Sequence, residues 1–347
     1  MMKTKRITGL DLAVGLLLPI IVYYGLSLGI GQGRSKFPRE QFHLIFDGAV
    51  AIFMFINGLA AGFSAGVNRN SDAVQRYVLQ RGVVFFALGL IVSLVWPSNL
   101  FLLSGSTSIV MAFMLQLHST ILRFIGFSLA LYTIYIYTLT DVNVGLSVFH
   151  QNGLIGSLFH LWQNGYYAFV PWFIFMLFGF LFSRSPLHLE SAARLRYILG
   201  AVLLVVALVS EFIFETNVFT SRRILNADAL NHTGLHLSMF SFLFAAHGLA
   251  LLFFQLTTQI NARWPDAKVL AALKHYSKMK YSMLLAQATA GALAALLLDA
   301  GESFGALTIV IFSLVVTAIS ALFAYVWSLR FAAGPVELVL RALTTRK

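Results

Sequence analysis

The chain has 347 residues, of which 59% are hydrophobic and 11% charged, and its formal net charge is +11 at pH 7. Its mean hydropathy is +0.83, whereas about a quarter of the residues of soluble globular proteins are charged. This composition excludes a soluble domain and predicts a polytopic integral membrane protein.

Ten apolar stretches recur along the chain, each long enough as a helix to cross about 30 Å of hydrocarbon. They are apolar on every face rather than alternating, and open sheet edges do not occur in lipid, so we predict an all-α polytopic membrane bundle. No linker interrupts them, which predicts a single domain over residues 1–347. The predicted spans are residues 9–30, 43–65, 78–97, 101–118, 119–140, 165–183, 194–215, 233–256, 280–298 and 304–331.

The basic residues predict an orientation. With both termini in the cytoplasm, most of the 24 Lys and Arg residues fall on the inner side, as the positive-inside rule requires. Short basic clusters beside spans contact anionic lipid headgroups, whereas nucleic-acid binding needs one continuous basic face. We therefore predict a protein of the bacterial inner membrane, with the lipid bilayer and no nucleic acid as partner. The sequence leaves open a homodimer.

The second predicted span carries His43 and Asp47 where it enters the membrane. An ionisable side chain in a span costs roughly 2.5 to 3.5 kcal/mol on insertion scales, so it is retained for catalysis, ion passage or pairing. Their spacing of four places both on one helix face, where the carboxylate can orient the imidazole as a general base. The alternative is that His43 lies among the headgroups and Asp47 is a favourable charge at the helix N-terminus.

Further along the same span, Asn57 and Gly58 are followed by small residues up to Ser64. Small residues at this spacing let two helix backbones approach closely. We predict that this part of the span is a packing face.

Two outer loops, near residues 141–165 and 211–236, are rich in hydrogen-bonding side chains. Such loops suit a sugar-like or other polar acceptor better than a lipid tail. The candidate substrate-binding residues are Trp162, Asn164, Arg222, Arg223 and His236.

No metal site is expected. The chain has no cysteine, and the nearest approach to metal-ligand spacing is His232 with His236, for which Asp228 is the only neighbouring carboxylate. His247, isolated in the eighth span, is either a neutral core histidine with its hydrogen bonds satisfied or a proton relay.

Five short motifs are distributed over most of the length of the chain in a fixed order. They resemble the transmembrane acyltransferase superfamily, specifically its branch of YeiB-like proteins and heparan-α-glucosaminide N-acetyltransferase-like proteins. The resemblance implies a helical bundle around a central cavity that moves an acyl group, such as acetyl, from cytoplasmic acyl-CoA to an acceptor on the outer side. The motifs are residues 6–18 (RITGLDLAVGLLL), 53–59 (FMFINGL), 76–90 (RYVLQRGVVFFALGL), 170–184 (VPWFIFMLFGFLFSR) and 331–344 (FAAGPVELVLRALT).

The resemblance also assigns residues. It matches the functional histidine of the family with His43 and the accompanying acidic residue with Asp47. The basic residues at the inner end of the third span and the inner start of the ninth become candidates for binding the donor phosphates, although such residues also anchor helices at the lipid interface. These candidates are Arg76, Arg81, Lys278 and Lys280.

Two positions depart from the family pattern. Val14 stands where the opening Arg-Gly pair has its arginine, and Tyr23-Tyr24 stand where the type 3 acyltransferases carry a histidine. The leading hypothesis is an inner-membrane O- or N-acyltransferase that modifies an envelope polysaccharide or other envelope component. The alternatives are a proton-coupled transporter or flippase using His247 with Glu211 and Glu215, and a non-catalytic membrane accessory protein.

Overall fold

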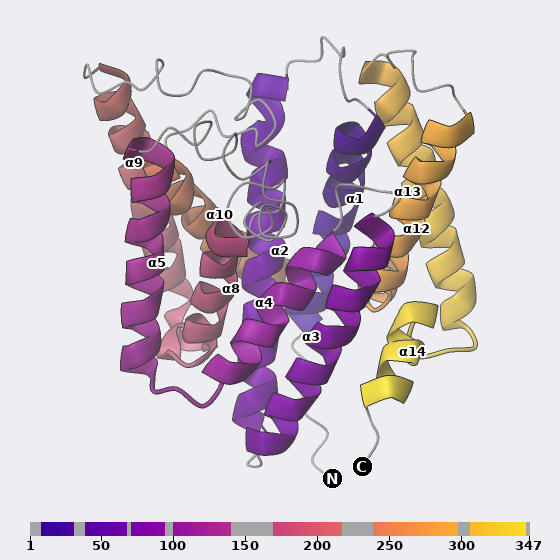
Figure 1. The fold of residues 1–347 in the computed structure, drawn as a ribbon, viewed down its shortest axis with the longest axis horizontal. Coiled ribbons are helices and arrows are strands. Elements are labelled where there is room, and N and C mark those ends of the chain that lie inside the picture. The colour runs from indigo at the N-terminus through magenta and orange to yellow at the C-terminus, as the bar shows by residue number, and fades with distance from the viewer. Residues whose placement is uncertain are drawn as a thin grey trace, which may run out of the picture. The chain divides into compact units, whose positions relative to one another are not determined.

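A computed structural model describes residues 8–30, 39–67, 71–93, 100–139, 169–216, 239–297 and 306–344. All regular structure in these ranges is helical (Figure 1). The predicted all-α membrane bundle is thereby confirmed.

The described ranges form twelve α-helices and two short 3₁₀ helices. The 3₁₀ helices are η2 (Pro186–His188) and η3 (Glu190–Ala192). The α-helices are α1 (Thr8–Ile30), α2 (Arg39–Val67), α3 (Ser71–Ser93), α4 (Leu100–Met114), α5 (Ser119–Leu139), α8 (Phe169–Ser183), α9 (Ala193–Thr216), α10 (Met239–Arg263), α11 (Lys268–Ser277), α12 (Lys280–Leu297), α13 (Ala306–Ser328) and α14 (Pro335–Thr344).

Each of the ten predicted spans overlaps one of these helices. Within the described ranges, six helices are long and apolar enough to cross a membrane, namely α1, α2, α3, α9, α10 and α13. Three further apolar helical stretches are shorter, namely Leu100–Met114 of α4, Ser119–Tyr135 of α5 and Phe169–Ser183 of α8.

Several helices turn large apolar side chains outward. Phe124 on α5 is 72% exposed and Leu208 on α9 is 71% exposed, and α13 exposes Leu314, Ile319 and Leu322. Exposed apolar faces of this extent are not stable in water and are the surfaces that contact lipid.

The chain divides into two compact units. Unit 1 comprises Met1–Pro38, Asp72–Ala112 and Leu256–Lys347, and unit 2 comprises Arg39–Ser71 and Phe113–Gln255.

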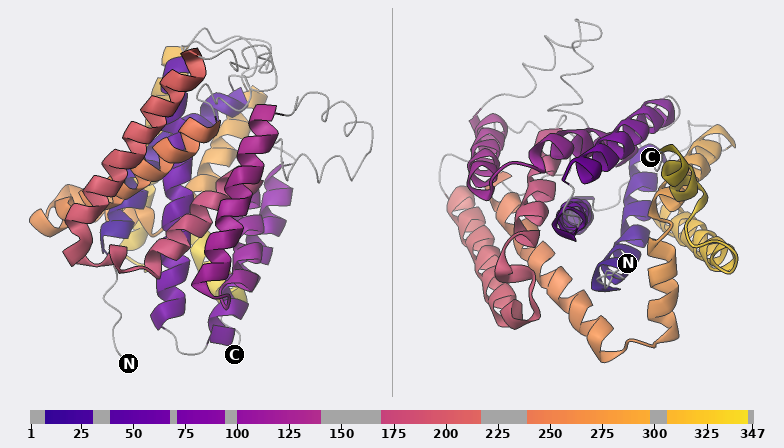
Figure 2. Two further views of the ribbon diagram at one scale, coloured as in Figure 1. Left: turned by 90° about the vertical axis from the view of Figure 1, so that its left-hand side faces the viewer. Right: turned by 90° about the horizontal axis from the view of Figure 1, so that it is seen from below.

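In unit 1, α1 packs against α11, α12 and α13 (Figure 2). A Cβ atom at Gly15 would overlap the carbonyl oxygen of Leu273, so glycine is what lets α11 lie directly on α1. The preceding Val14 is 5% exposed. The position that holds an arginine in the acyltransferase-like proteins is therefore an apolar core position in this chain.

The helices α3 and α4, also in unit 1, meet through glycines on both sides. Added Cβ atoms at Gly89 and Gly105 would overlap the backbone nitrogens of Leu102 and Phe86, respectively. This contact holds α3 against α4. It thereby also fixes the position of Arg81 on α3.

In unit 2, α2 packs along α8, and glycines on both helices bring the two backbones together. A Cβ atom at Gly58 would overlap the carbonyl oxygen of Met176, and one at Gly179 would overlap that of Phe55. This confirms the predicted packing face of the second span.

Two arginines of unit 2 hold the connection between α8 and α9. Arg196 is 2% exposed, and it donates hydrogen bonds to Gln255 Oε1 and to the carbonyl oxygens of Leu187 and Leu189 at 2.5 to 2.6 Å. Arg184 is exposed, and it donates to carbonyl oxygens that follow α4, including that of Leu117 at 2.7 Å; partial desolvation lowers its pKa from the usual value. The hydrogen bonds of Arg196 satisfy a buried guanidinium group that would be costly to bury alone.

Candidate functional site

The predicted catalytic pair lies on α2 in unit 2. Because α2 is continuous from Arg39 to Val67, positions 43 and 47 share one helix face. Asp47 is 1% exposed, and it lies two turns inside the helix. The alternative of an N-terminal helix charge is therefore wrong, since that effect is confined to the first turn. The side chain of His43 lies outside the part that the structure describes.

A cluster of cationic and aromatic side chains forms in unit 1 around Tyr281. Arg81 Nη2 donates a hydrogen bond of 2.7 Å to the Tyr281 hydroxyl. The guanidinium carbon lies 5.0 Å from the centre of the Tyr281 ring and 5.2 Å from that of Phe85. The two residues joined by this hydrogen bond are 200 positions apart in the sequence.

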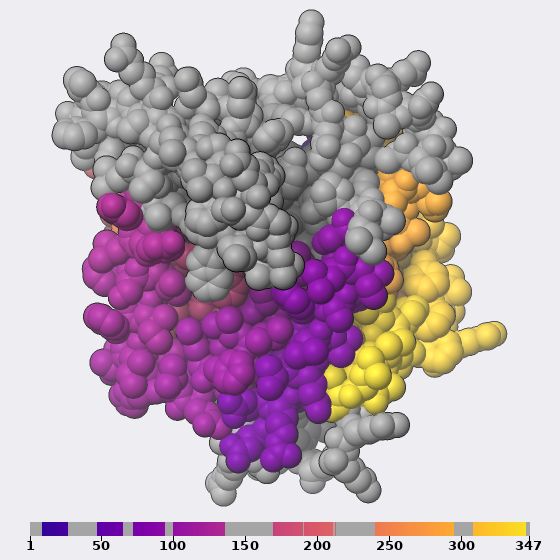
Figure 3. All heavy atoms as spheres, in the orientation of Figure 1, coloured from indigo at the N-terminus to yellow at the C-terminus, as the bar shows by residue number. Residues whose placement is uncertain are grey.

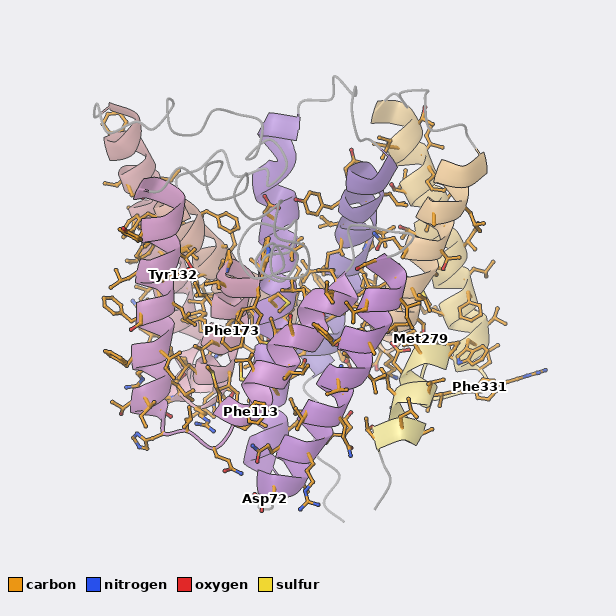
Figure 4. The ribbon with its side chains drawn as sticks, in the orientation of Figure 1. Asp72, Phe113, Tyr132, Phe173, Met279 and Phe331 are labelled. Carbon is orange, nitrogen blue, oxygen red and sulfur yellow. The ribbon has the colours of Figure 1, made fainter. Side chains whose placement is uncertain are left out.

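Lys280 joins the same cluster from the start of α12. Its Nζ lies 4.9 Å from the centre of the Tyr281 ring. Arg81 and Lys280 therefore both contact the ring of the same tyrosine. Both side chains are half-buried, and Tyr281 is buried. Met279, which directly precedes Lys280, marks this position in Figure 4. Cations held over aromatic rings gain electrostatic stabilisation from the ring faces.

The carboxylate of this cluster comes from α14. Glu337 Oε1 accepts hydrogen bonds from the backbone nitrogens of Tyr281 and Ser282 at 2.7 and 3.3 Å, and Oε2 accepts from the Ser282 hydroxyl at 2.5 Å. Glu337 thus caps the N-terminus of α12, where a negative charge is favourable. Atoms of α14 and α3 adjoin at the surface in Figure 3.

Gly334 and Pro335 place this cap. A Cβ atom at Gly334 would overlap Glu337 Oε2, and Pro335 begins α14 at the position where its missing N–H is no loss. Both carboxylate oxygens of Glu337 accept hydrogen bonds from the first turn of α12. The cluster contains two cationic side chains, Arg81 and Lys280, and this one carboxylate, so its net charge is positive.

We expect Glu337→Gln to destabilise the protein by about 1 to 2 kcal/mol, because an N-terminal cap loses its charge and one of its acceptor oxygens becomes a donor group. Thermal unfolding of the detergent-solubilised chain measures this change. Asp266→Asn is the control. It alters an exposed carboxylate and should leave the unfolding temperature unchanged. Equal unfolding temperatures for Glu337→Gln and the native chain would contradict the capping role.

The other two predicted phosphate ligands do not join the cluster. Arg76 is exposed on α3, and Lys278 lies beside His275, whose pKa is lowered by burial and further by the Lys278 charge. The neighbouring Tyr276 is buried, which raises the pKa of its phenol above the usual range. Arg81 itself lies ten residues, about 15 Å, from the start of α3. It is therefore deeper in that helix than the predicted inner end.

His247 lies in unit 2, in contact with the rings of Phe175 and Phe178 at centroid distances of 4.6 and 4.4 Å. Its Nδ1 is 2.6 Å from the carbonyl oxygen of Leu243, an oxygen that can only accept, so Nδ1 carries a proton. These contacts match the interpretation as a satisfied core histidine.

The predicted substrate-binding residues Trp162, Asn164, Arg222, Arg223 and His236 lie outside the described residues, as do His232 and Asp228. The residues that sequence reasoning missed are Tyr281 and Glu337. The signal for Glu337 was present in the Gly-Pro-x-Glu start of the last helix, which is typical of a helix N-terminus with an acidic first turn.

Residues 181–347 match a family described as "Protein of unknown function (DUF418)". This family is associated with YeiB-like membrane proteins. The matched range includes Lys280, Tyr281 and Glu337 but not Arg81, His43 or Asp47. No curated protein and no solved structure matches the chain.

Proposed function

We propose that the protein is a membrane-bound acyltransferase that moves an acyl group from cytoplasmic acyl-CoA to a sugar or other envelope acceptor on the outer side of the bacterial inner membrane. The observation that carries the proposal is the convergence of Arg81 and Lys280 on one tyrosine ring. Two adjacent cations, with the neighbouring carboxylate engaged in capping a helix, suit a ligand with two adjacent negative charges. The diphosphate of acyl-CoA is such a ligand.

The chemistry needs a base for the acceptor. His43 accepts the proton of the acceptor hydroxyl or amine, whose oxygen or nitrogen then attacks the acyl carbonyl carbon. The carbon–sulfur bond breaks, and the released thiolate of CoA takes up a proton. Asp47 orients the imidazole. The support for this assignment is that Asp47 is a buried carboxylate one helical turn from His43, inside an apolar helix, where an ionisable group is costly unless it has a function.

We expect Arg81→Gln and Lys280→Gln each to weaken acetyl-CoA binding by about tenfold or more, since a hydrogen bond to a charged group contributes about 1.5 to 3 kcal/mol. Calorimetric titration of the purified, detergent-solubilised chain measures the affinity.

Arg76→Gln is the matched control, because it removes an exposed arginine from the same helix and should leave acetyl-CoA binding unchanged. Unaltered binding in the Arg81→Gln/Lys280→Gln double variant would refute the donor site. No acetyl-CoA binding to the native chain, together with proton-dependent uptake in proteoliposomes, would favour the transporter.

A further inference from the structure

Unit 2 contains a groove that the proposed reaction does not use. Its volume is about 550 Å³, and it is lined by residues of α5, α8, α9 and α10 together with the connection after α8. Of the lining residues, only Arg123, Ser185 and His247 have polar side chains. The groove reaches the outer surface of the unit, since Phe127 and Leu131 line it and are 63% and 51% exposed.

Small residues of α5 make room for this groove. Gly126 and Ala130 both line it, and a Cβ atom at Gly126 would come no closer than 3.4 Å to the Leu177 side chain across it. The contact between α5 and α8 is therefore loose at this level, in contrast to the backbone contact between α2 and α8.

The length of the groove matches one leaflet of a membrane. Along α5 it extends from Arg123 to Ile134 and along α8 from Ile174 to Ser185. Eleven residues of helix rise about 16 Å, and half of the hydrocarbon core is about 15 Å thick. One lipid acyl chain, which extends through one leaflet, therefore matches the groove in length.

The polar groups of the groove lie mainly at one end. Arg123, in the first turn and a half of α5, and Ser185, just beyond α8, are both at that end. Arg123 is exposed, and the neighbouring Arg184, also exposed, donates its hydrogen bonds to carbonyl oxygens that follow α4. In the middle of the groove, His247 Nδ1 donates a hydrogen bond to the Leu243 carbonyl oxygen. This nitrogen therefore does not require a hydrogen bond from a ligand.

We propose that this groove binds one acyl chain of an anionic membrane phospholipid, with the lipid phosphate at Arg123. The apolar walls take up the chain, the length limits it to one leaflet, and Arg123, the one lysine or arginine among the lining residues, selects a negatively charged headgroup. The proposal does not depend on the proposed acyl transfer, since none of the residues assigned to that reaction lines the groove.

Photo-crosslinking tests the proposal. The full chain is placed in nanodiscs of phosphatidylcholine that contain a small fraction of phosphatidylglycerol with a diazirine in one acyl chain. After irradiation, mass spectrometry is expected to find adducts on peptides of α5, α8 and α10 that line the groove. Unlabelled phosphatidylglycerol should suppress these adducts, and unlabelled phosphatidylcholine should not.

Two pairs of variants make the test specific. Arg123→Gln is expected to reduce groove labelling about fivefold, while Arg194→Gln, at an exposed arginine that does not line the groove, leaves it unchanged. Ala130→Phe is expected to fill the groove and remove the labelling, while Ala201→Phe, on an exposed face of α9, retains it.

The proposal is overturned if adducts spread evenly over the exposed apolar faces, if Ala130→Phe leaves groove labelling intact in a chain of native unfolding temperature, or if a phosphatidylcholine probe labels the groove equally well. Labelling by a free fatty acid probe but not by the phospholipid would also overturn it. The proposal is likewise overturned if a protein copurifies with the chain and shields the groove from every lipid probe.

Discussion

Gly58→Ala is expected to destabilise the protein by about 2 kcal/mol. The added Cβ atom would overlap the carbonyl oxygen of Met176 and lie 3.0 Å from the backbone nitrogen of Phe180. Backbone atoms of a packed helix cannot rotate away, so α2 and α8 must separate along their contact, and overpacking of this kind costs about 1 to 3 kcal/mol. The higher helix propensity of alanine, up to about 1 kcal/mol, offsets only part of this loss. The apparent unfolding temperature of the detergent-solubilised chain measures the effect.

Gly126→Ala is the matched control on α5. There the nearest atom to the new methyl group is a Leu177 side-chain carbon at 3.4 Å, which is an ordinary contact. This variant is expected to be as stable as the native chain or slightly more stable. Equal stability of Gly58→Ala and Gly126→Ala would contradict the backbone contact between α2 and α8.

Hydropathy predicts ten of the twelve α-helices in the described ranges, but it misses α11 and α14 and places several helix ends wrongly. The predicted third span began at residue 78, whereas α3 begins at Ser71, and the predicted eighth span ended at 256, whereas α10 continues to Arg263. Both extensions are polar, with Asp72 and Arg76 in one and Gln259 and Asn261 in the other. Hydropathy reports the apolar part of a helix, and a helix continues past it wherever the backbone hydrogen bonds are still satisfied.

Close backbone contacts are partly visible in the sequence. The run of small residues after Asn57 predicts a packing face, and Gly58 in this run contacts the backbone of α8 at Met176. Gly15 serves the same purpose on α1, but a single glycine in an apolar run gives no such signal. Its partner, the Leu273 carbonyl group on α11, is fixed only by the tertiary arrangement.

The cation cluster shows why a site is harder to predict than a span. Basic residues beside spans look alike in the sequence, and four of them are equivalent candidates. Only the fold separates Arg81 and Lys280, which share Tyr281, from Arg76, which is exposed. The separation of 200 positions between Arg81 and Tyr281 places their contact beyond any local pattern.

Asp47→Asn is expected to lower acyl transfer by about 10²- to 10⁴-fold, the usual contribution of positioned acid–base groups. Asparagine keeps the volume of the buried side chain but removes the charge that would stabilise the protonated imidazole of His43. Transfer is measured as CoA released from acetyl-CoA in membranes that contain the envelope acceptors. Because the chain has no cysteine, a thiol reagent does not react with this protein, and membranes with the gene deleted give the remaining background.

Asp72→Asn, at an exposed aspartate of α3, is the control and should retain full turnover. A positioning role also predicts that the two substitutions are not additive, because Asp47 acts only through His43. The His43→Ala/Asp47→Asn double variant should therefore be no slower than His43→Ala alone, with acetyl-CoA binding unchanged in all three. Losses that multiply in the double variant would show that Asp47 supports the fold rather than the histidine, and full turnover in His43→Ala would remove the catalytic pair altogether.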